Sequence, residues 1–163
     1  MELTAAATRW IDAPPDRLYR YLADFRNHHH RFLPEAFSDF RVLEGGYGTG
    51  TVNRFTMTLG GQPRRLRTIV TEPEPGQVLV EIAADGSSRT KFTVTPEGTG
   101  ARVQIETSWA SARGLPGIME RLVAPAMLRR VYAEELELLE LYARSQDARA
   151  AAPAANEASP LNA

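Results

Sequence analysis

The sequence contains no cysteine, only one lysine (Lys91) and no hydrophobic run of membrane-spanning length. The lack of cysteine excludes disulfides, thiolate metal sites and a cysteine nucleophile. A net charge of -1 at pH 7 gives no overall field that would attract nucleic acid or an anionic membrane. The first thirty residues also lack the basic and then apolar layout of a signal peptide. These absences predict a soluble cytoplasmic protein without stable membrane insertion.

The chain has 163 residues, 43% of them hydrophobic, which is enough for one domain with its own core. From residue 146 onward the composition changes to Ala, Ser and Pro, and Leu161 is the one large apolar residue there. Such a segment buries too little surface to offset its ordering entropy. We therefore predict a folded domain over residues 1–145 and a disordered tail over residues 146–163.

The first part of the domain predicts a strand followed by a short helix. Residues 2–11 form the candidate strand, and Pro14-Pro15-Asp16 is typical of a helix start, where prolines are tolerated. One face of the helix then carries apolar side chains at helical spacing, namely Leu18, Tyr21, Leu22 and Phe25. This pattern stops in the segment NHHHRFLPEAF, near Pro34.

Six further strands are predicted between Ser38 and Ser111, each bounded by turn residues. They cover residues 38–44, 51–59, 64–72, 77–84, 89–96 and 101–111. The short links between them allow antiparallel neighbours and exclude parallel crossovers. After Gly114 a long amphipathic helix is expected, with a kink at Pro125. Its apolar side chains toward one side are Leu115, Met119, Leu122, Ala126, Met127, Val131, Leu138 and Leu141.

This order of elements predicts an α+β fold. A curved, seven-stranded antiparallel sheet has one face to cover, and the C-terminal helix is the element long enough to cover it. We expect the sheet to wrap around this helix in a helix-grip arrangement, with short helices after the first strand.

Several segments resemble the START/Bet v1-like (SRPBCC) superfamily, and within it the bacterial polyketide cyclase/dehydrase-like branch. They are IDAPPDRLYRYLADFRNH with FLP at 32–34, GTG before the strand at 51, TEPEPGQVLVEI, TPEGTGARVQIETSW and the Pro-containing C-terminal helix. The resemblance runs from about residue 3 to 143. It implies a deep cavity between sheet and helix that holds a lipid, a polyketide or another apolar or aromatic molecule. It supplies no catalytic residues, because the superfamily shares none.

Three other features of the sequence suggest alternative sites. His28, His29 and His30 are consecutive, so their side chains diverge and do not form a metal site, and we expect them in a solvated loop at the cavity rim. The segment Gly45–Gly50 lacks the Lys-Ser/Thr pair and the following helix of a phosphate-binding loop. The arginines could form basic patches, but no aromatic residues alternate with them as in nucleic-acid binders. They are Arg64, Arg65, Arg67, Arg129 and Arg130.

The candidate ligand-binding residues are bulky or adaptable apolar side chains and a few polar ones that could orient a ligand. They are Asn53, Phe55, Met57, Phe92, Thr107, Trp109, Met119, Leu122, Met127 and, over the cavity mouth, Tyr47. The sequence does not decide which side of strand 51–59 faces the cavity, because Arg54 alternates with Asn53 and Phe55. If Arg54 or Arg67 is inside, it should meet an anion or a carboxylate.

Two functions fit these observations. The first is a binding protein for an apolar small molecule, monomeric or weakly dimeric, with no cofactor, metal or catalytic residue. The second is a polyketide aromatase/cyclase or dehydratase, which would need a general base. The sequence shows no Asp or Glu that is clearly buried, and this favours binding. A filled core without a cavity would instead indicate a role in protein association.

Overall fold

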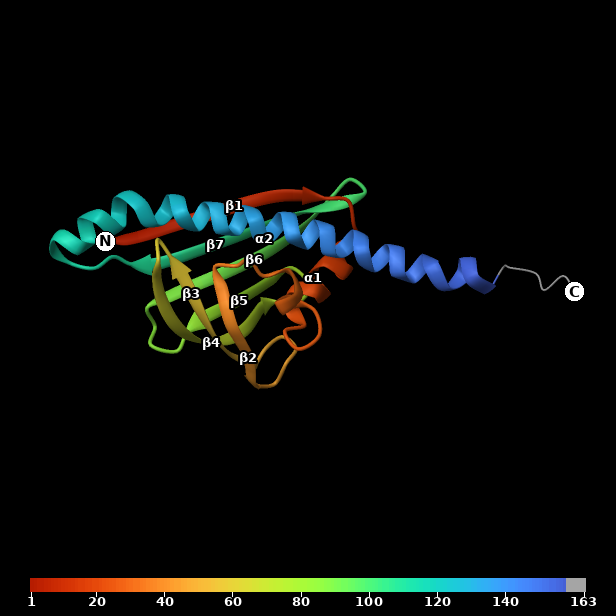
Figure 1. Ribbon diagram of the computed structural model, residues 1–163, viewed down its shortest axis with the longest axis horizontal. Coiled ribbons are helices and arrows are strands. Elements are labelled where there is room, and N and C mark those ends of the chain that lie inside the picture. The colour runs from red at the N-terminus through yellow and green to blue at the C-terminus, as the bar shows by residue number, and fades with distance from the viewer. Residues whose placement is uncertain (158–163) are drawn as a thin grey trace, which may run out of the picture.

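The computed structural model describes residues 1–157 and has seven strands, two α-helices and one short 3-10 helix (Figure 1). The strands are β1 (Glu2–Ile11), β2 (Phe37–Glu44), β3 (Val52–Leu59), β4 (Gln62–Glu74), β5 (Val78–Ala83), β6 (Ser88–Glu97) and β7 (Gly100–Ala110). The helices are α1 (Pro15–Ala23), η1 (His29–Phe32) and α2 (Gly114–Glu157). Each strand expected from the sequence is present, and its ends differ from the prediction by at most two residues.

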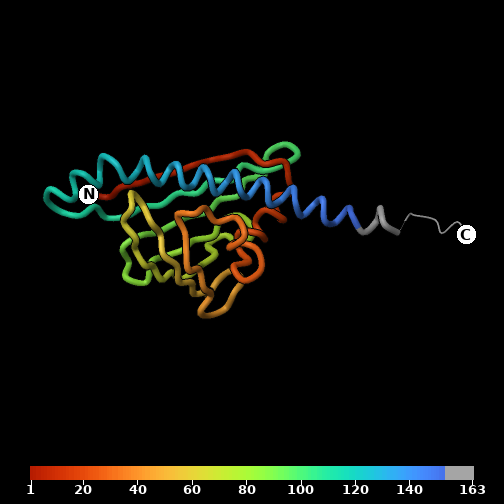
Figure 2. Tube along the Cα trace, in the orientation of Figure 1, coloured from red at the N-terminus to blue at the C-terminus, as the bar shows by residue number. Residues whose placement is uncertain are grey.

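The strands form one antiparallel sheet in the order β1-β7-β6-β5-β4-β3-β2. The chain starts at one edge, crosses to the other through α1 and η1, and returns strand by strand to β7 beside β1 (Figure 2). The sheet curves around α2, which packs along β1. The predicted α+β helix-grip fold is therefore confirmed.

Helix α1 closes one end of the sheet. It begins at Pro15, where the absent amide hydrogen costs no hydrogen bond, and Leu18 N donates to the Pro14 carbonyl at 3.1 Å. Its side chains Leu18 and Leu22 are fully buried, together with Phe25 and Phe32 in the segment that follows. This cluster fills the space between sheet and α2 at one end, so the cavity is confined to the remainder.

Helix α2 is continuous across Pro125 and extends to Glu157. The predicted domain boundary at residue 145 therefore lies within this helix, and residues 146–157 are helical where a disordered tail was expected. Arg17 of α1 pairs with Asp147 beyond that boundary. The rest of the predicted tail, residues 158–163, lies outside the described residues.

The face of α2 that packs on the sheet differs from the predicted one. Its buried side chains are Leu128, Tyr132, Glu135, Leu136, Leu139 and Ala143. Toward the start of the helix, the same face continues at spacings of four residues with Ala124 and Glu120, which face the sheet. Leu115, Leu122 and Leu141 are exposed. The predicted face was wrong because many of the apolar side chains near the start of α2 lie on the side that does not pack on the sheet.

Candidate functional site

A cavity of about 460 Å³ lies between the concave face of the sheet and α2. Apolar side chains from the η1–β2 region, the sheet and α2 form most of its wall, namely Leu33, Phe37, Phe40, Phe55, Met57, Leu59, Leu66, Phe92, Trp109, Ala124 and Leu128. At its outer end the lining includes exposed residues of the β3–β4 hairpin, Gln62, Pro63 and Arg64. The inner end is polar and buried.

A row of polar side chains crosses the inner end, one from each of five neighbouring strands. The polar row comprises Asn53, Thr68, Glu81, Thr90 and Thr107. Asn53 lies opposite Thr68, Glu81 opposite Thr90, and Thr90 opposite Thr107 in the strand register. Side chains at such positions share one face of the sheet. The row thus places hydrogen-bonding groups side by side within an otherwise apolar wall.

Hydrogen bonds join most of the polar row. Thr68 Oγ1 donates to Glu81 Oε2 at 2.8 Å. The Thr107 hydroxyl lies 2.7 Å from that of Thr90 and 2.5 Å from the hydroxyl of Tyr132 on α2. Burial raises the pKa of Tyr132 well above its ordinary value, so this hydroxyl stays protonated.

His29 and Glu135 form a buried pair next to the polar row. His29 comes from η1 and Glu135 from α2, and each residue is only 2% exposed. His29 Nδ1 lies 2.6 Å from the Leu22 carbonyl oxygen, which can only accept, so Nδ1 carries a hydrogen. His29 Nε2 then faces Glu135 Oε1 at 3.5 Å. The pair can hold one further proton, on the imidazole or on the carboxyl group.

The electrostatic surroundings favour a charged imidazole and a neutral Glu81. Burial by itself lowers the pKa of His29, but Glu135, Glu81 and the Leu22 carbonyl together raise it above the ordinary histidine value. Burial raises the pKa of the Glu81 carboxyl, and the nearby His29 and the Thr68 hydroxyl offset this only in part. The cavity therefore contains an acid and a base in the same buried cluster.

Three buried polar atoms of this cluster have no hydrogen-bond partner in the part of the chain that the structure describes. They are Asn53 Nδ2, Asn53 Oδ1 and Glu135 Oε1. Asn53 lies close enough to Glu81 to favour its ionised form, without a hydrogen bond of normal geometry. The His29 contact is likewise an ion pair and not a hydrogen bond. Unmatched buried polar groups are costly and often mark functional sites.

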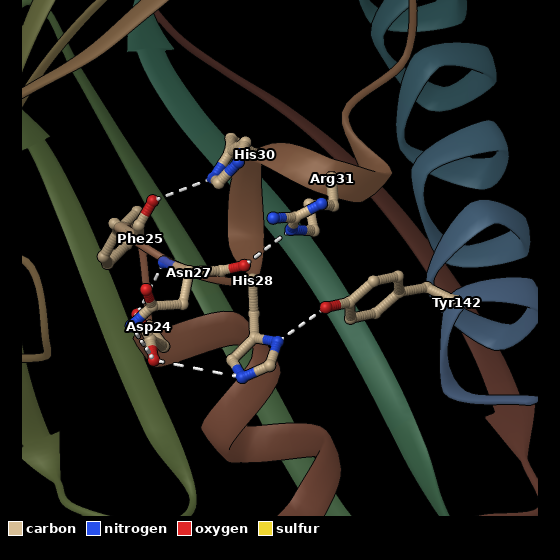
Figure 3. Close-up of polar contacts among 7 residues, drawn as sticks. All are labelled: Asp24, Phe25, Asn27, His28, His30, Arg31 and Tyr142. Carbon is tan, nitrogen blue, oxygen red and sulfur yellow. Dashed lines mark hydrogen bonds and ion pairs between the residues drawn. The ribbon is translucent and has the colours of Figure 1, made fainter. Parts of the chain in front are cut away.

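The three consecutive histidines have separate environments. His28 Nδ1 lies 2.6 Å from the Tyr142 hydroxyl, and His30 Nδ1 lies 3.3 Å from the Phe25 carbonyl (Figure 3). His30 is exposed and His28 half-buried, whereas His29 stacks on Phe25 within the core. The expectation of a solvated rim loop is wrong for His29, because the tight turn of η1 directs this side chain inward. Within residues 1–157, no group of three or more His, Asp or Glu side chains is arranged to hold a metal ion.

Five of the candidate ligand-binding residues line the cavity: Phe55, Met57, Phe92, Thr107 and Trp109. Asn53 lies in the polar row and is fully buried, but it is not among the residues that line the cavity. Phe55 and Met57 show which side of β3 faces inward, while Arg54 is exposed. Arg67 is also exposed, and its guanidinium lies 3.9 Å from Glu44 on the surface.

The other four candidates lie outside the cavity lining. Met119 and Leu122 are 62% and 71% exposed at the start of α2. Met127 packs over Gly60 in the β3–β4 hairpin. A Cβ atom added to Gly60 would lie 3.0 Å from Met127 Cε. Tyr47 is 55% exposed and borders a separate, shallow pocket near Tyr19. Its backbone pairs with Asp24, which fastens the 45–50 loop to the end of α1.

Glu81 and Glu135 were not among the residues predicted from the sequence, and His29 was predicted in a different environment. Glu81 stands in the otherwise apolar segment VLVEIA, at the position in the alternation shared by Leu79 and Ala83. Glu135 lies three and four residues from Tyr132 and Leu139, in the buried stripe of α2. Both signals were present in the sequence. His29 had no comparable signal, because its direction depends on the geometry of a short loop.

Residues 2–144 match the model of the family described as polyketide cyclase/dehydrase and lipid transport. The chain therefore belongs to this family, within the START/Bet v1-like (SRPBCC) superfamily. No curated protein sequence matches it. No helix within the described residues is long and apolar enough to cross a membrane.

Solved structures agree with this assignment. The KanY protein, solved by NMR, is 30% identical, with a TM-score of 0.78 over 88% of this chain and 99% of its own. The ZhuI aromatase/cyclase from Streptomyces sp. R1128 is 16% identical, with a TM-score of 0.70 over 88% and 94%. A START superfamily protein from Mycobacterium smegmatis is also 16% identical, with a TM-score of 0.68 over 88% and 98%. The last two similarities show the shared fold.

Proposed function

We propose that the protein binds an apolar or aromatic small molecule, such as a lipid or a polyketide, between the sheet and α2. The observation that carries this proposal is the cavity itself, with a mainly apolar wall and polar groups gathered at one end. Pockets that bind small molecules have this composition, because apolar contacts supply affinity and a few polar groups fix orientation. The family, described as polyketide cyclase/dehydrase and lipid transport, and the similarity to an aromatase/cyclase structure support the same class of ligand.

The size of the cavity supports occupancy. At about 24 cal/mol per Å³, a dry cavity of 460 Å³ would cost about 11 kcal/mol. This is comparable with the whole stability of a typical domain. Ligand or water must therefore fill the space, and the apolar wall favours a ligand over most of its length.

Native mass spectrometry of the full chain, purified without denaturation, tests the proposal directly. We expect an added mass that is released by organic solvent. Affinity is then measured by titration with N-phenyl-1-naphthylamine, an apolar fluorescent probe. Trp109→Ala should weaken binding by about ten-fold or more, because a buried aromatic contact is lost.

The matched control for this variant is Trp10→Ala, because Trp10 is 42% exposed on β1 and does not line the cavity. It should leave the affinity unchanged. Equal affinities in both variants, or no binding of the probe by the natural chain, would contradict the proposal.

The His29–Glu135 pair favours a second candidate function, a polyketide aromatase/cyclase or dehydratase. The Glu135 carboxylate of this pair could take a proton from the carbon next to a ketone, and Tyr132 or a neutral Glu81 could donate a hydrogen bond to the enolate oxygen. The enolate carbon would attack a second carbonyl of the bent chain, and the proton would return to the new alkoxide. The acid and base that the sequence did not reveal are thus available in the cavity.

Incubation with a short poly-β-ketone thioester, followed by mass spectrometry, separates the two functions. Loss of water or a cyclised product that disappears in His29→Gln would establish the enzyme. An unchanged thioester that remains bound would leave the protein as a carrier. The cytoplasmic location, the monomeric or weakly dimeric state, and the absence of a cofactor and of nucleic-acid binding remain predictions.

A further inference from the structure

The inner end of the cavity offers a definite set of unused hydrogen-bonding groups. The hydroxyls of Thr90, Thr107 and Tyr132 form a chain with two hydrogen bonds, so one of their three hydrogens is left over. Glu135 Oε1 has no hydrogen-bond partner among the described residues, and Glu81 also faces the cavity. A ligand group that donates to a carboxylate and accepts from a hydroxyl would therefore fit.

The charges at the inner end disfavour an anionic ligand group. His29 contributes at most one positive charge, whereas Glu81 and Glu135 contribute up to two negative charges. The net charge of the three is therefore -1 when all are ionised and zero when one carboxyl group is protonated. Burying an anion without an unpaired positive partner is strongly unfavourable. Among the described residues that line the cavity, the one Arg or Lys is Arg64, which lies at the exposed outer end with its guanidinium 3.5 Å from the Ser87 hydroxyl.

We propose that the inner end selects apolar ligands that carry a neutral hydroxyl or hydroxyl-carbonyl group, such as a phenol, an enol or a β-hydroxyketone, and rejects carboxylates. This inference rests on the proposed binding function and specifies its ligand class. A plain hydrocarbon would leave Glu135 Oε1 without a partner. A carboxylate would add a negative charge beside Glu81 and Glu135.

The test compares naphthalene, 1-naphthol and 1-naphthoate, which share one ring system and differ in the polar group. Their affinities are measured at neutral pH by displacement of N-phenyl-1-naphthylamine. We expect 1-naphthol to bind about ten-fold more tightly than naphthalene, since one or two hydrogen bonds are gained. We expect 1-naphthoate to bind at least about ten-fold more weakly than 1-naphthol, because its charge is not compensated.

Two variants assign the selectivity to the inner end. Glu135→Gln removes one buried negative charge at equal size, so the difference between 1-naphthol and 1-naphthoate should shrink. Its control is Glu134→Gln, the same change at the exposed neighbouring position, which should keep the difference. Thr107→Val alters the hydroxyl chain without changing charge, and it should reduce the preference for 1-naphthol over naphthalene. It serves as the second test if Glu135→Gln does not fold.

The outcomes separate this inference from the proposed function. If naphthalene binds as tightly as 1-naphthol, or 1-naphthoate binds most tightly, the ligand class is wrong while binding in the cavity stands. If the probe binds and both variants retain the natural selectivity, the inner end does not set it. If the natural chain binds neither the probe nor any of the three ligands, the proposed function fails as well.

Discussion

Two glutamates on α2 line the same cavity, and their surroundings are opposite. At the outer end Glu120 accepts hydrogen bonds from Trp109 Nε1 at 2.9 Å and from Ala112 N at 2.8 Å. Both of its oxygens are matched, so it ties the β7–α2 loop to the helix. At the inner end Glu135 Oε1 lies 3.5 Å from the His29 ring and has no hydrogen-bond partner among the described residues. A carboxylate held by its own chain thus stabilises the fold, while one left unmatched in a buried cluster is available to a ligand.

The strongest test of this comparison is Glu135→Ala. This change leaves His29 without its partner inside the core, and breaking a buried ion pair costs about 3–5 kcal/mol. Urea unfolding followed by circular dichroism measures the loss. Glu134→Ala, at the exposed neighbouring position, should change the free energy of unfolding by less than about 0.5 kcal/mol. A small loss for Glu135→Ala would mean that the pair is not charged.

A smaller loss is expected for Glu120→Ala. The variant removes two hydrogen bonds at the partly exposed outer end, and we expect about 1.5–3 kcal/mol from loss of bonds to a charged group. The same urea titration measures it. Trp109 fluorescence should also change, because its indole loses an acceptor. A loss equal to that of Glu135→Ala would remove the difference between the two ends.

The dependence of stability on pH compares the inner end with the rest of the molecule. Since the folded state raises the pKa of His29 above 6.5, its contribution is complete below 6.5 and is lost as the pH rises through the folded value. The folded state also raises the pKa of Glu81 above 4.5, so the contribution of Glu81 to stability likewise decreases as the pH rises above 4.5. These two groups should therefore make unfolding easier as the pH rises.

Urea midpoints measured at a series of pH values test this sign. Glu135→Gln removes the main group that raises the pKa of His29, so the slope above pH 6.5 should become shallower. Lysine and arginine do not titrate in this range, and they do not compete with the effect. An increase in stability with pH above 6.5 in the natural chain would show that His29 is neutral in the folded protein.

The smallest effect is expected at the exposed start of α2. Leu122 is 71% exposed, so Leu122→Ser should change the free energy of unfolding by less than about 0.5 kcal/mol and leave probe binding unchanged. Leu128→Ala, six residues further along on the buried face, should cost about 2–5 kcal/mol. Thermal unfolding of the two variants is the measurement. Weaker probe binding by Leu122→Ser would show that Leu122 contributes to ligand binding.

The fold was largely predictable because its signals are local. Alternation along the segment around Val103 and Ile105, and the turn residues between strands, indicated the strands and their neighbours. The helical spacing of Leu18 and Leu22 did the same for α1. The apolar wall was predictable in part, since Phe55, Phe92 and Trp109 line the cavity. Met119 and Leu122 do not line it, because hydrophobicity alone does not show which face of a long helix packs.

The antiparallel pairing of strands joined by short turns, the long final helix and the family could be predicted from the sequence, because periodicity, turn chemistry and family motifs are readable along the chain. The place where the polar groups gather depends instead on the three-dimensional packing. Asn53, Glu81 and Glu135 belong to three elements, and His29 to a fourth. Their proximity follows from the strand register and from the packing of α2 on the sheet. Burial then changes their chemistry, because a charge removed from water depends on the few groups around it.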